Sequence, residues 1–146
     1  MDEYVMRIIL NYDEYCRLLE LKPLNAIEST QNYCIFDNSN IVDSACKNNT
    51  MLGEMNVRKT VLEHSNDIIV ELSENTYLGT SDYELEIEYD PEVMRSAECL
   101  LNYYAEYIDL SLYGEYAVTF VDRLKSAKTK EQRFAERLSK TNIIYD

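Results

Sequence analysis

Asn75-Thr-Tyr-Leu-Gly-Thr-Ser-Asp-Tyr-Glu-Leu-Glu-Ile-Glu-Tyr-Asp90 decides the fold, because a tight turn at Gly79 leads into a strand in which every second residue is acidic. Successive side chains of a β-strand point to opposite faces of the sheet. Glu84, Glu86 and Glu88 therefore share one face. The other face carries the apolar residues Tyr83, Leu85, Ile87 and Tyr89. Carboxylates at steps of about 7 Å repel one another, so either water or cations must face them.

The residues just before this stretch predict an antiparallel meander. Met51–Glu63 and Ile68–Leu72 are strand candidates, and the polar cluster His64–Asp67 between them is typical of a turn. We expect a second turn over Glu74–Ser81 before the acidic strand. On the first of these strands Arg58 shares a face with Asn56 and Thr60 and is a candidate to point into a cavity. Lys59 is expected to point to the opposite face.

The N-terminal third predicts two strands and a helix. Asp2–Leu10 is rich in Val, Ile and Tyr and reads as a strand. Tyr12–Leu21 has a helical apolar spacing with Asn11 as its N-cap, and it must end before Pro23. Gln31–Phe36 is a further strand candidate. Asp37–Asn49 is polar, asparagine-rich and without a period, which indicates a loop.

The C-terminal third predicts helices. Pro91, capped by Asp90, begins a helix over Glu92–Tyr107. Tyr113–Lys125 fits a helix better than the alternative strand over Tyr116–Val121, and Lys130–Leu138 predicts a short final helix. No linker or repeat divides the chain. We therefore expect a single α+β domain over residues 1–146, with a strongly curved antiparallel sheet flanked by helices.

Composition narrows the function classes. The net charge of −13 argues against a nucleic-acid partner, because the chain lacks a basic footprint. No apolar run is long enough to span a membrane and the N-terminus lacks a signal-peptide layout, so we expect a cytoplasmic protein. The four cysteines lack the paired spacing of a zinc site and are expected to be free thiols. His64 is the only histidine and lies in a polar turn, which argues against His-dependent nucleophilic catalysis.

The stretch Asn75–Glu88 resembles the second acidic strand of the CYTH, or triphosphate-tunnel, family. A Ser/Thr-Lys-x-x-Arg-Phe element near the C-terminus is also typical of that family, and here it reads Thr129-Lys-Glu-Gln-Arg-Phe134. The resemblance extends over roughly Leu52–Leu138. It implies that the curved sheet forms a complete or partial tunnel-like barrel, closed by the C-terminal element.

The resemblance also implies a site. Glu84 and Glu86, with Glu3, would hold Mg²⁺ or Mn²⁺. Arg7, Arg58, Lys130 and Arg133 would bind the phosphates of a triphosphate or nucleotide, and a catalytic set would comprise Glu84, Glu86 and Lys130. Carboxylate oxygens are suitable ligands for a hard cation such as Mg²⁺. Arginine binds phosphate oxygens through two N–H groups, and lysine binds them as a point charge.

The sequence departs from the family pattern in two places. The first-strand signature Glu-x-Glu-x-Lys becomes Glu3, Val5 and Arg7, so one metal-side carboxylate is lost. The family's first-half arginine strand and the lysine strand after it are missing between Gln31 and Thr50. Losing several cations would remove about 1.5–3 kcal/mol of transition-state stabilisation per charged hydrogen bond, which argues against efficient triphosphatase activity.

The sequence supports two functions about equally. One is a CYTH-like polyphosphate- or nucleotide-binding protein with metal-dependent triphosphatase activity. The other is a non-catalytic binding or protein-interaction module on the same scaffold. A homodimer whose partner completes the wall of the barrel is compatible with either function.

Overall fold

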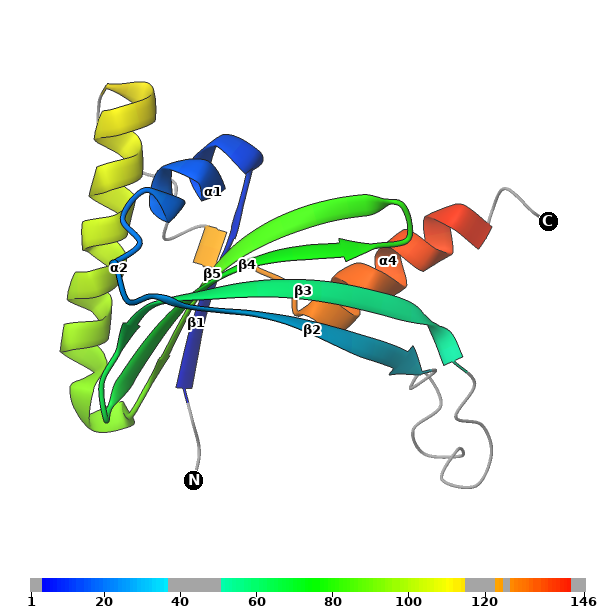
Figure 1. Cartoon of the computed structure of the whole chain (residues 1–146), viewed down its shortest axis with the longest axis horizontal. Helices are drawn as coiled ribbons and strands as arrows, with labels where there is room; N and C mark the ends of the chain where they lie inside the picture. Colours follow the sequence, from blue (N-terminus) through cyan, green and yellow to red (C-terminus); the bar gives the residue numbers. More distant parts are fainter. Residues whose placement is uncertain (1–3, 37–50, 115–122, 125–126, 143–146) are drawn as a thin grey trace.

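The computed structural model describes residues 4–36, 51–114, 123–124 and 127–142, which form an α+β structure on one antiparallel sheet (Figure 1). The strands lie in the order β1-β5-β4-β3-β2. Their bounds are β1 Tyr4–Leu10, β2 Ile27–Phe36, β3 Met51–His64, β4 Ile68–Tyr77 and β5 Thr80–Tyr89. Strands β1 and β2 are the two edges and do not pair with each other, so the sheet formed by the described residues is open.

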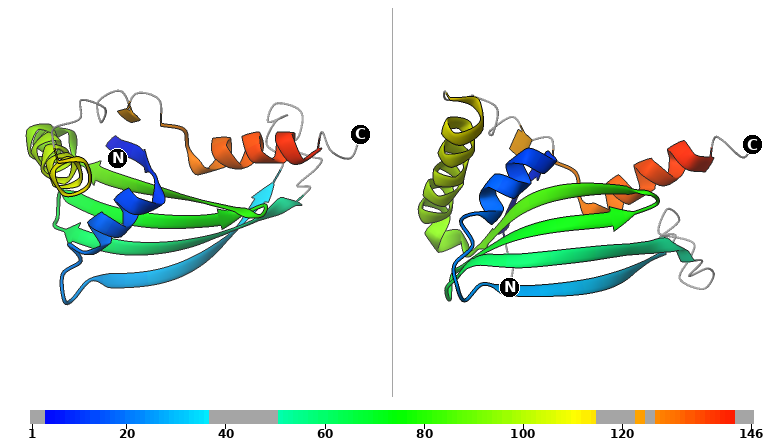
Figure 2. Two further views of the ribbon diagram at one scale, coloured as in Figure 1. Left: turned by 90° about the horizontal axis from the view of Figure 1, so that it is seen from above. Right: turned by 45° about the horizontal axis from the view of Figure 1, so that its top comes forward.

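Three α-helices of the described chain accompany this strongly twisted sheet (Figure 2). They are α1 (Tyr12–Leu19), α2 (Met94–Ile108) and α4 (Lys130–Asn142). A 3₁₀ turn, η2 (Pro91–Val93), precedes α2, and a π-helical turn, η3 (Asp109–Tyr113), follows it. None of the helices in the described residues is long and apolar enough to cross a membrane.

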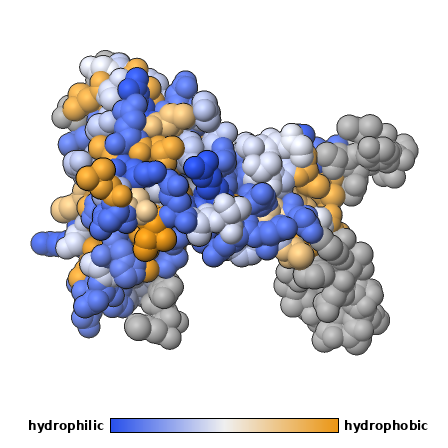
Figure 3. All heavy atoms as spheres, in the orientation of Figure 1, coloured by the Kyte–Doolittle hydropathy of each residue, from blue (hydrophilic) through white to orange (hydrophobic). Residues whose placement is uncertain are grey.

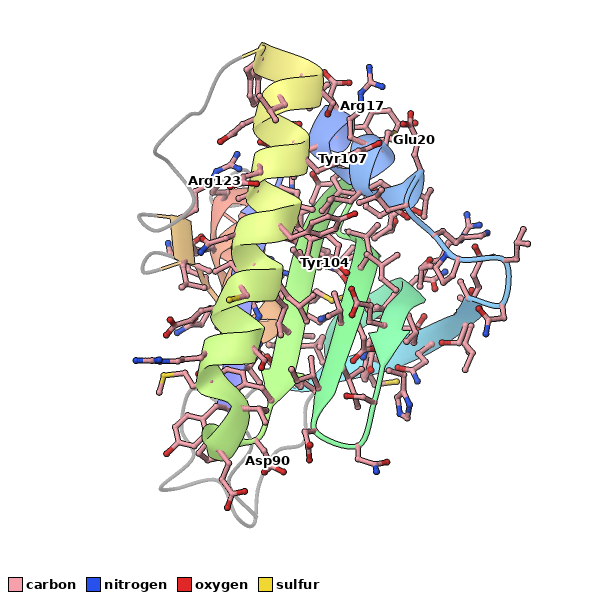
Figure 4. All side chains as sticks on the ribbon, turned by 90° about the vertical axis from the view of Figure 1, so that its left-hand side faces the viewer. Arg17, Glu20, Asp90, Tyr104, Tyr107 and Arg123 are labelled. Atoms are coloured by element: carbon pink, nitrogen blue, oxygen red, sulfur yellow. The ribbon has the colours of Figure 1, made fainter. Side chains whose placement is uncertain are left out.

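Helix α1 begins at Tyr12 with Asn11 as its N-cap, as expected. The Asn11 side chain accepts a hydrogen bond from the Glu14 backbone N–H at 2.8 Å, and the Glu14 carboxylate accepts one from the Asn11 N–H at 2.9 Å. This capping box satisfies two of the N–H groups that a helix start leaves open. Glu14 is buried, and Arg123 forms a two-point ion pair with it (2.7 and 2.9 Å), which fastens residues 123–124 to α1 (Figure 4).

We call the side of the sheet that bears Glu84 and Glu86 the acidic face, and the side that bears Leu85 and Ile87 the apolar face. Helices α1 and α2 cover the apolar face, and α2 runs along it (Figure 4). Tyr104 of α2 donates a hydrogen bond to Glu63 of β3 at 2.7 Å, and burial raises the pKa of this tyrosine. The main core on this face includes the fully buried residues Ile8, Leu18, Leu72, Leu85, Ile87 and Ile108.

A smaller apolar cluster lies on the acidic face, where α4 packs. Phe134 of α4 is fully buried against Met55, Val57 and Tyr77. Gly53 permits this contact, because a Cβ atom built at that position would lie 2.9 Å from the Phe134 ring. The sequence Thr129–Phe134 therefore supplies an apolar anchor directly beside its two cations.

Several element boundaries differ from the sequence-based expectation. The predicted turn over Glu74–Ser81 is wrong, because β4 continues to Tyr77 and only Leu78 and Gly79 form the turn. Both have positive φ (46° and 75°), as a two-residue type I′ hairpin requires. Strand β2 begins four residues earlier than expected, at Ile27. Asp90 occupies the predicted N-cap position before Pro91, but its side chain makes no capping hydrogen bond.

Some predictions lie outside the described residues. These are the loop over Asp37–Asn49, most of the segment Tyr113–Lys125, and the first residues of the N-terminal strand, including Glu3. On the face seen in Figure 3, hydrophilic side chains lie over the sheet and apolar ones gather mainly toward the α1 and α2 end.

Candidate functional site

The carboxylates of β5 face the interior of the protein. The Glu84 side chain is fully buried, whereas the Glu86 and Asp82 side chains are 13% and 18% exposed. Water therefore cannot be the main partner of these groups, and a buried carboxylate needs a compensating cation or hydrogen-bond donors. The alternation of the sequence predicted which face they share, and that prediction is confirmed by the pairing of β5 with β1 and β4.

Two of the compensating cations come from the first turn of α4. The Lys130 ammonium donates to Glu84 Oε1 and to Glu86 Oε1, the latter at 3.0 Å. Arg133 Nε donates to Asp82 Oδ2 at 2.8 Å, and Arg133 Nη2 lies 3.2 Å from Glu84 Oε2. Because residues three apart lie on one side of a helix, both cations reach the same strand.

The start of α4 is fixed by a capping box. Thr129 N–H donates to the Gln132 side chain at 2.8 Å, and the Gln132 N–H donates to Thr129 Oγ1 at 3.2 Å. This reciprocal pair is the pattern that a threonine at the cap and a glutamine three residues later predict. It fixes the helical turn from which Lys130 and Arg133 project.

The third cation is Arg7, which comes from β1. Arg7 lies directly opposite Glu86 in the β1–β5 ladder. Its Nε is 3.4 Å from both Glu84 Oε2 and Glu86 Oε1. One cluster therefore brings together five of the site residues that were predicted from the sequence: Glu84, Glu86, Arg7, Lys130 and Arg133.

Six charged residues meet here, and their formal charges sum to zero. We call this set the acidic cluster: Asp82, Glu84, Glu86, Arg7, Lys130 and Arg133. Each carboxylate has at least one cation as a partner. The repulsion expected along the acidic strand is thus cancelled within the protein. The predicted metal ligand Glu3 lies outside the described residues.

The expectation that Arg58 joins these cations is wrong. Arg58 pairs in register with Glu74, which pairs with Tyr83, so Arg58 lies on the apolar side of the sheet. Its side chain is 56% exposed and approaches Glu28 at 3.9 Å. Lys59, expected on the other face, is instead the β3 cation on the acidic face, where it approaches Glu71 at 3.7 Å.

A β-bulge explains this reversal. The register of β3 against β4 shifts by one residue between Val61 and Glu63. A one-residue shift moves every preceding side chain of the strand to the opposite face. Without the extra residue, Arg58 would pair with Asn75 and would lie on the acidic face.

Three further residues belong to the site and were not singled out from sequence. Asp82 is the main partner of Arg133. Tyr77 donates a hydrogen bond to Asp82 at 2.5 Å, and burial raises the pKa of its phenol. Asn75, directly opposite Asp82 in the ladder, donates to it at 2.8 Å. The sequence did contain a signal for these residues. Asn75 and Tyr77 follow Ser73 at steps of two on β4, and Asp82 precedes Glu84 by two on β5, so all of them lie on the face of Glu84.

Burial and neighbouring charges separate the two central carboxyl groups. Burial raises the pKa of Glu84, and the Glu86 carboxylate raises it further, against the opposing effect of Lys130 and Arg133. Burial also acts to raise the pKa of Glu86, but the charge and hydrogen bond of Lys130 outweigh it and lower this pKa to about 2. One group of the pair therefore holds a proton more readily than the other, as in carboxylate pairs with distinct roles.

This separation predicts a stability effect in acid. The folded pKa of Glu86 lies below the ordinary value of about 4.3, so its contribution is fully present above that pH and is lost as the pH falls toward 2. We expect Glu86→Gln to cost at most about 3 kcal/mol at neutral pH and nearly nothing near pH 2. Urea unfolding of both proteins across this range measures the difference; a difference that does not change with pH would contradict the assignment.

No family model, curated protein or solved structure matches this chain. Within the described residues, no group of three or more His, Cys, Asp or Glu side chains is arranged to hold a metal ion. The CYTH resemblance therefore stays a prediction that depends on the residues quoted for it.

Proposed function

We propose that this chain is a CYTH-like protein that binds a small phosphorylated ligand, a triphosphate or a nucleotide, on the acidic face. The observation that carries the proposal is the convergence of Arg7, Lys130 and Arg133 on the carboxylates of β5. Two of these cations are on α4 and one is on β1, so elements at opposite ends of the chain supply one cluster. Such a concentration of buried and part-buried cations suits the oxygens of a polyphosphate.

Binding on this account is an exchange of partners. The ammonium of Lys130 is shared by Glu84 and Glu86, and Arg7 lies at 3.4 Å from both, which is a long contact for a charged hydrogen bond. A phosphate can take these cations over, provided that another positive charge replaces them beside the carboxylates. A Mg²⁺ or Mn²⁺ ion that enters with the phosphate chain would meet that need.

The donor set fits such an ion in part. Glu84 and Glu86 offer two carboxylates, and Mg²⁺ in phosphate sites commonly uses one or two together with phosphate oxygens. The buried Asn75 Oδ1 has no hydrogen-bond partner within the described structure, and the amide nitrogen of the same side chain lies 3.5 Å from Glu84 Oε1. When bound, the metal would supply charge neutralisation for phosphoryl transfer and would orient a water molecule. The chain's own contribution is to orient the phosphates through Arg7, Lys130 and Arg133.

We further propose that the acidic face is the wall of a partial tunnel, with α4 across one end. The packing of Phe134 on Met55, Val57 and Tyr77 supports this arrangement, because it holds α4 over the sheet. A triphosphate would lie along β5, with its oxygens toward the first turn of α4.

A second candidate is a binding or protein-interaction module without turnover. One observation favours it: Glu84 already contacts Lys130, Arg133, Arg7 and Asn75, so its carboxylate is well satisfied in the absence of any ligand. Arg58 lies on the other face and so adds no cation to the site.

The experiment measures phosphate release from tripolyphosphate and ATP with Mg²⁺ or Mn²⁺, together with ligand binding by calorimetry. We expect Lys130→Gln to weaken tripolyphosphate binding by about 10- to 100-fold, the loss of one charged hydrogen bond or more. Arg58→Gln is the matched control and should leave binding unchanged. Release that disappears in Glu84→Gln/Glu86→Gln supports the enzyme, and binding without release supports the module. Binding that is equally weak or equally strong in all variants would contradict phosphate binding by this cluster and leave the protein-interaction module.

A further inference from the structure

Strand β2 presents an unusual edge. It has ten residues and pairs with β3 but with no other described strand. Its side chains from Ile27 to Cys34 are all exposed, which means that both faces of the strand are uncovered. Ile27 is 64% exposed and Tyr33 is 38% exposed. In both views of Figure 2, β2 lies outermost, on the side of the sheet away from α2.

This edge also lacks the usual features that prevent strand pairing. Native edge strands are commonly short or carry proline, lysine or inward-pointing charges. Glu28 is the only charged residue of β2, and its charge is already met by Lys22 at 2.5 Å. From Ser29 to Ile35 the strand contains neither a charge nor a proline. The opposite edge, β1, is shorter and buries every second side chain from Met6 to Leu10.

We propose that β2 pairs antiparallel with β2 of a second copy of this chain, forming a continuous two-fold symmetric sheet. A two-fold axis perpendicular to the sheet places residues of equal parity opposite each other, so each face continues into the same face of the partner. This inference does not depend on phosphate binding.

The side chains favour the register centred on Gln31. There Ile27 lies opposite the partner's Ile35, and both belong to the acidic-face side of the strand. Glu28 lies opposite the partner's Cys34, six positions from the partner's Glu28, which is about 20 Å along the strand. Apolar side chains therefore meet at both ends, and the single carboxylate of each strand is far from its counterpart.

The choice of a second copy follows from this self-complementarity. A charged peptide would find only Glu28 on β2, which Lys22 already pairs. An isologous pair uses up the exposed edge of both molecules and therefore closes as a dimer. The charge of −13 on each copy opposes association at long range. Because salt screens such repulsion beyond about 10 Å, dimerisation should strengthen as salt is raised.

Sedimentation equilibrium over a wide range of protein and salt concentration tests the proposal. Gln31→Lys places two ammonium groups directly opposite each other, and we expect it to weaken the dimer about tenfold or more. Thr76→Lys is the matched control, since Thr76 is an exposed strand residue away from the edge. A protein that stays monomeric throughout, or a Gln31→Lys dimer as tight as the wild type, would overturn the proposal.

Cross-linking tests the register. In a background with Cys46 and Cys99 changed to serine, the native Cys34 should not form a dimer disulfide, because the two copies of Cys34 are about 20 Å apart. In the same background, Cys34→Ser/Gln31→Cys should form one on mild oxidation. Efficient cross-linking through Cys34, or none through the new cysteine, would overturn the register centred on Gln31.

Discussion

Replacing Glu84 with alanine is expected to lower the free energy of unfolding by about 3–5 kcal/mol at neutral pH. The Glu84 carboxylate is fully buried and contacts Lys130, Arg133 and Arg7. Its removal leaves three cations facing only Asp82 and Glu86. An uncompensated charge in a buried position costs far more than the loss of a surface ion pair. Urea unfolding followed by circular dichroism measures the change.

Glu54→Ala is the control for this substitution, because Glu54 is an exposed glutamate on β3 of the same sheet. It should change the stability by no more than about 0.5 kcal/mol. A double-mutant cycle of Glu84→Gln and Lys130→Gln should give a coupling free energy of about 0.5–3 kcal/mol. If Glu84→Ala and Glu54→Ala changed the free energy of unfolding equally, the Glu84 carboxylate would not be buried.

Phe134→Ala is the second substitution with a large expected effect, about 3–5 kcal/mol. The ring is fully buried and is the only α4 side chain among the fully buried residues of the smaller apolar cluster. Its loss leaves a cavity between the helix and the residues Met55, Val57 and Tyr77. Because α4 carries Lys130 and Arg133, tripolyphosphate binding should fall together with stability.

Hydrogen exchange shows whether Phe134→Ala destabilises α4 alone or the whole fold. We expect the amides of Lys130–Asn142 to lose protection in Phe134→Ala, while those of β1 and α1 keep theirs, because the main core lies on the other face. Phe134→Leu preserves most of the apolar volume and should cost markedly less. Unchanged protection in α4 of the alanine variant would show that Phe134 does not anchor the helix.

The sequence allowed much of the cluster to be predicted because its signals are local. The alternation of Glu84, Glu86 and Glu88 assigns the face without knowledge of any other strand, and the spacing of Lys130 and Arg133 assigns one side of a helix. The capped start of α1 at Asn11 was likewise visible in the sequence. In each case the structure depends on residues only two to four positions apart.

The errors arose where distant parts of the chain decide the outcome. The face of Arg58 depends on one bulged residue in β3, which no periodicity within that strand reveals. The polar residues Ser73 and Asn75 look like part of a turn, but they are buried strand residues because they face Glu84 and Asp82 across the ladder. The contact of Phe134 over Gly53 joins segments some eighty residues apart, so only the folded structure discloses it.

The most direct test of the account is carboxyl-carbon NMR of Glu84 and Glu86 during a titration with tripolyphosphate and Mg²⁺. We predict that Glu86 titrates with a pKa of about 2 in the free protein. Both carboxyl resonances, and that of the Lys130 ammonium, should shift when the ligand is added, whereas Glu54 should not respond. If Glu86 titrates like an exposed glutamate, or if the ligand moves surface resonances and leaves Glu84 and Glu86 unchanged, the acidic cluster is not the binding site.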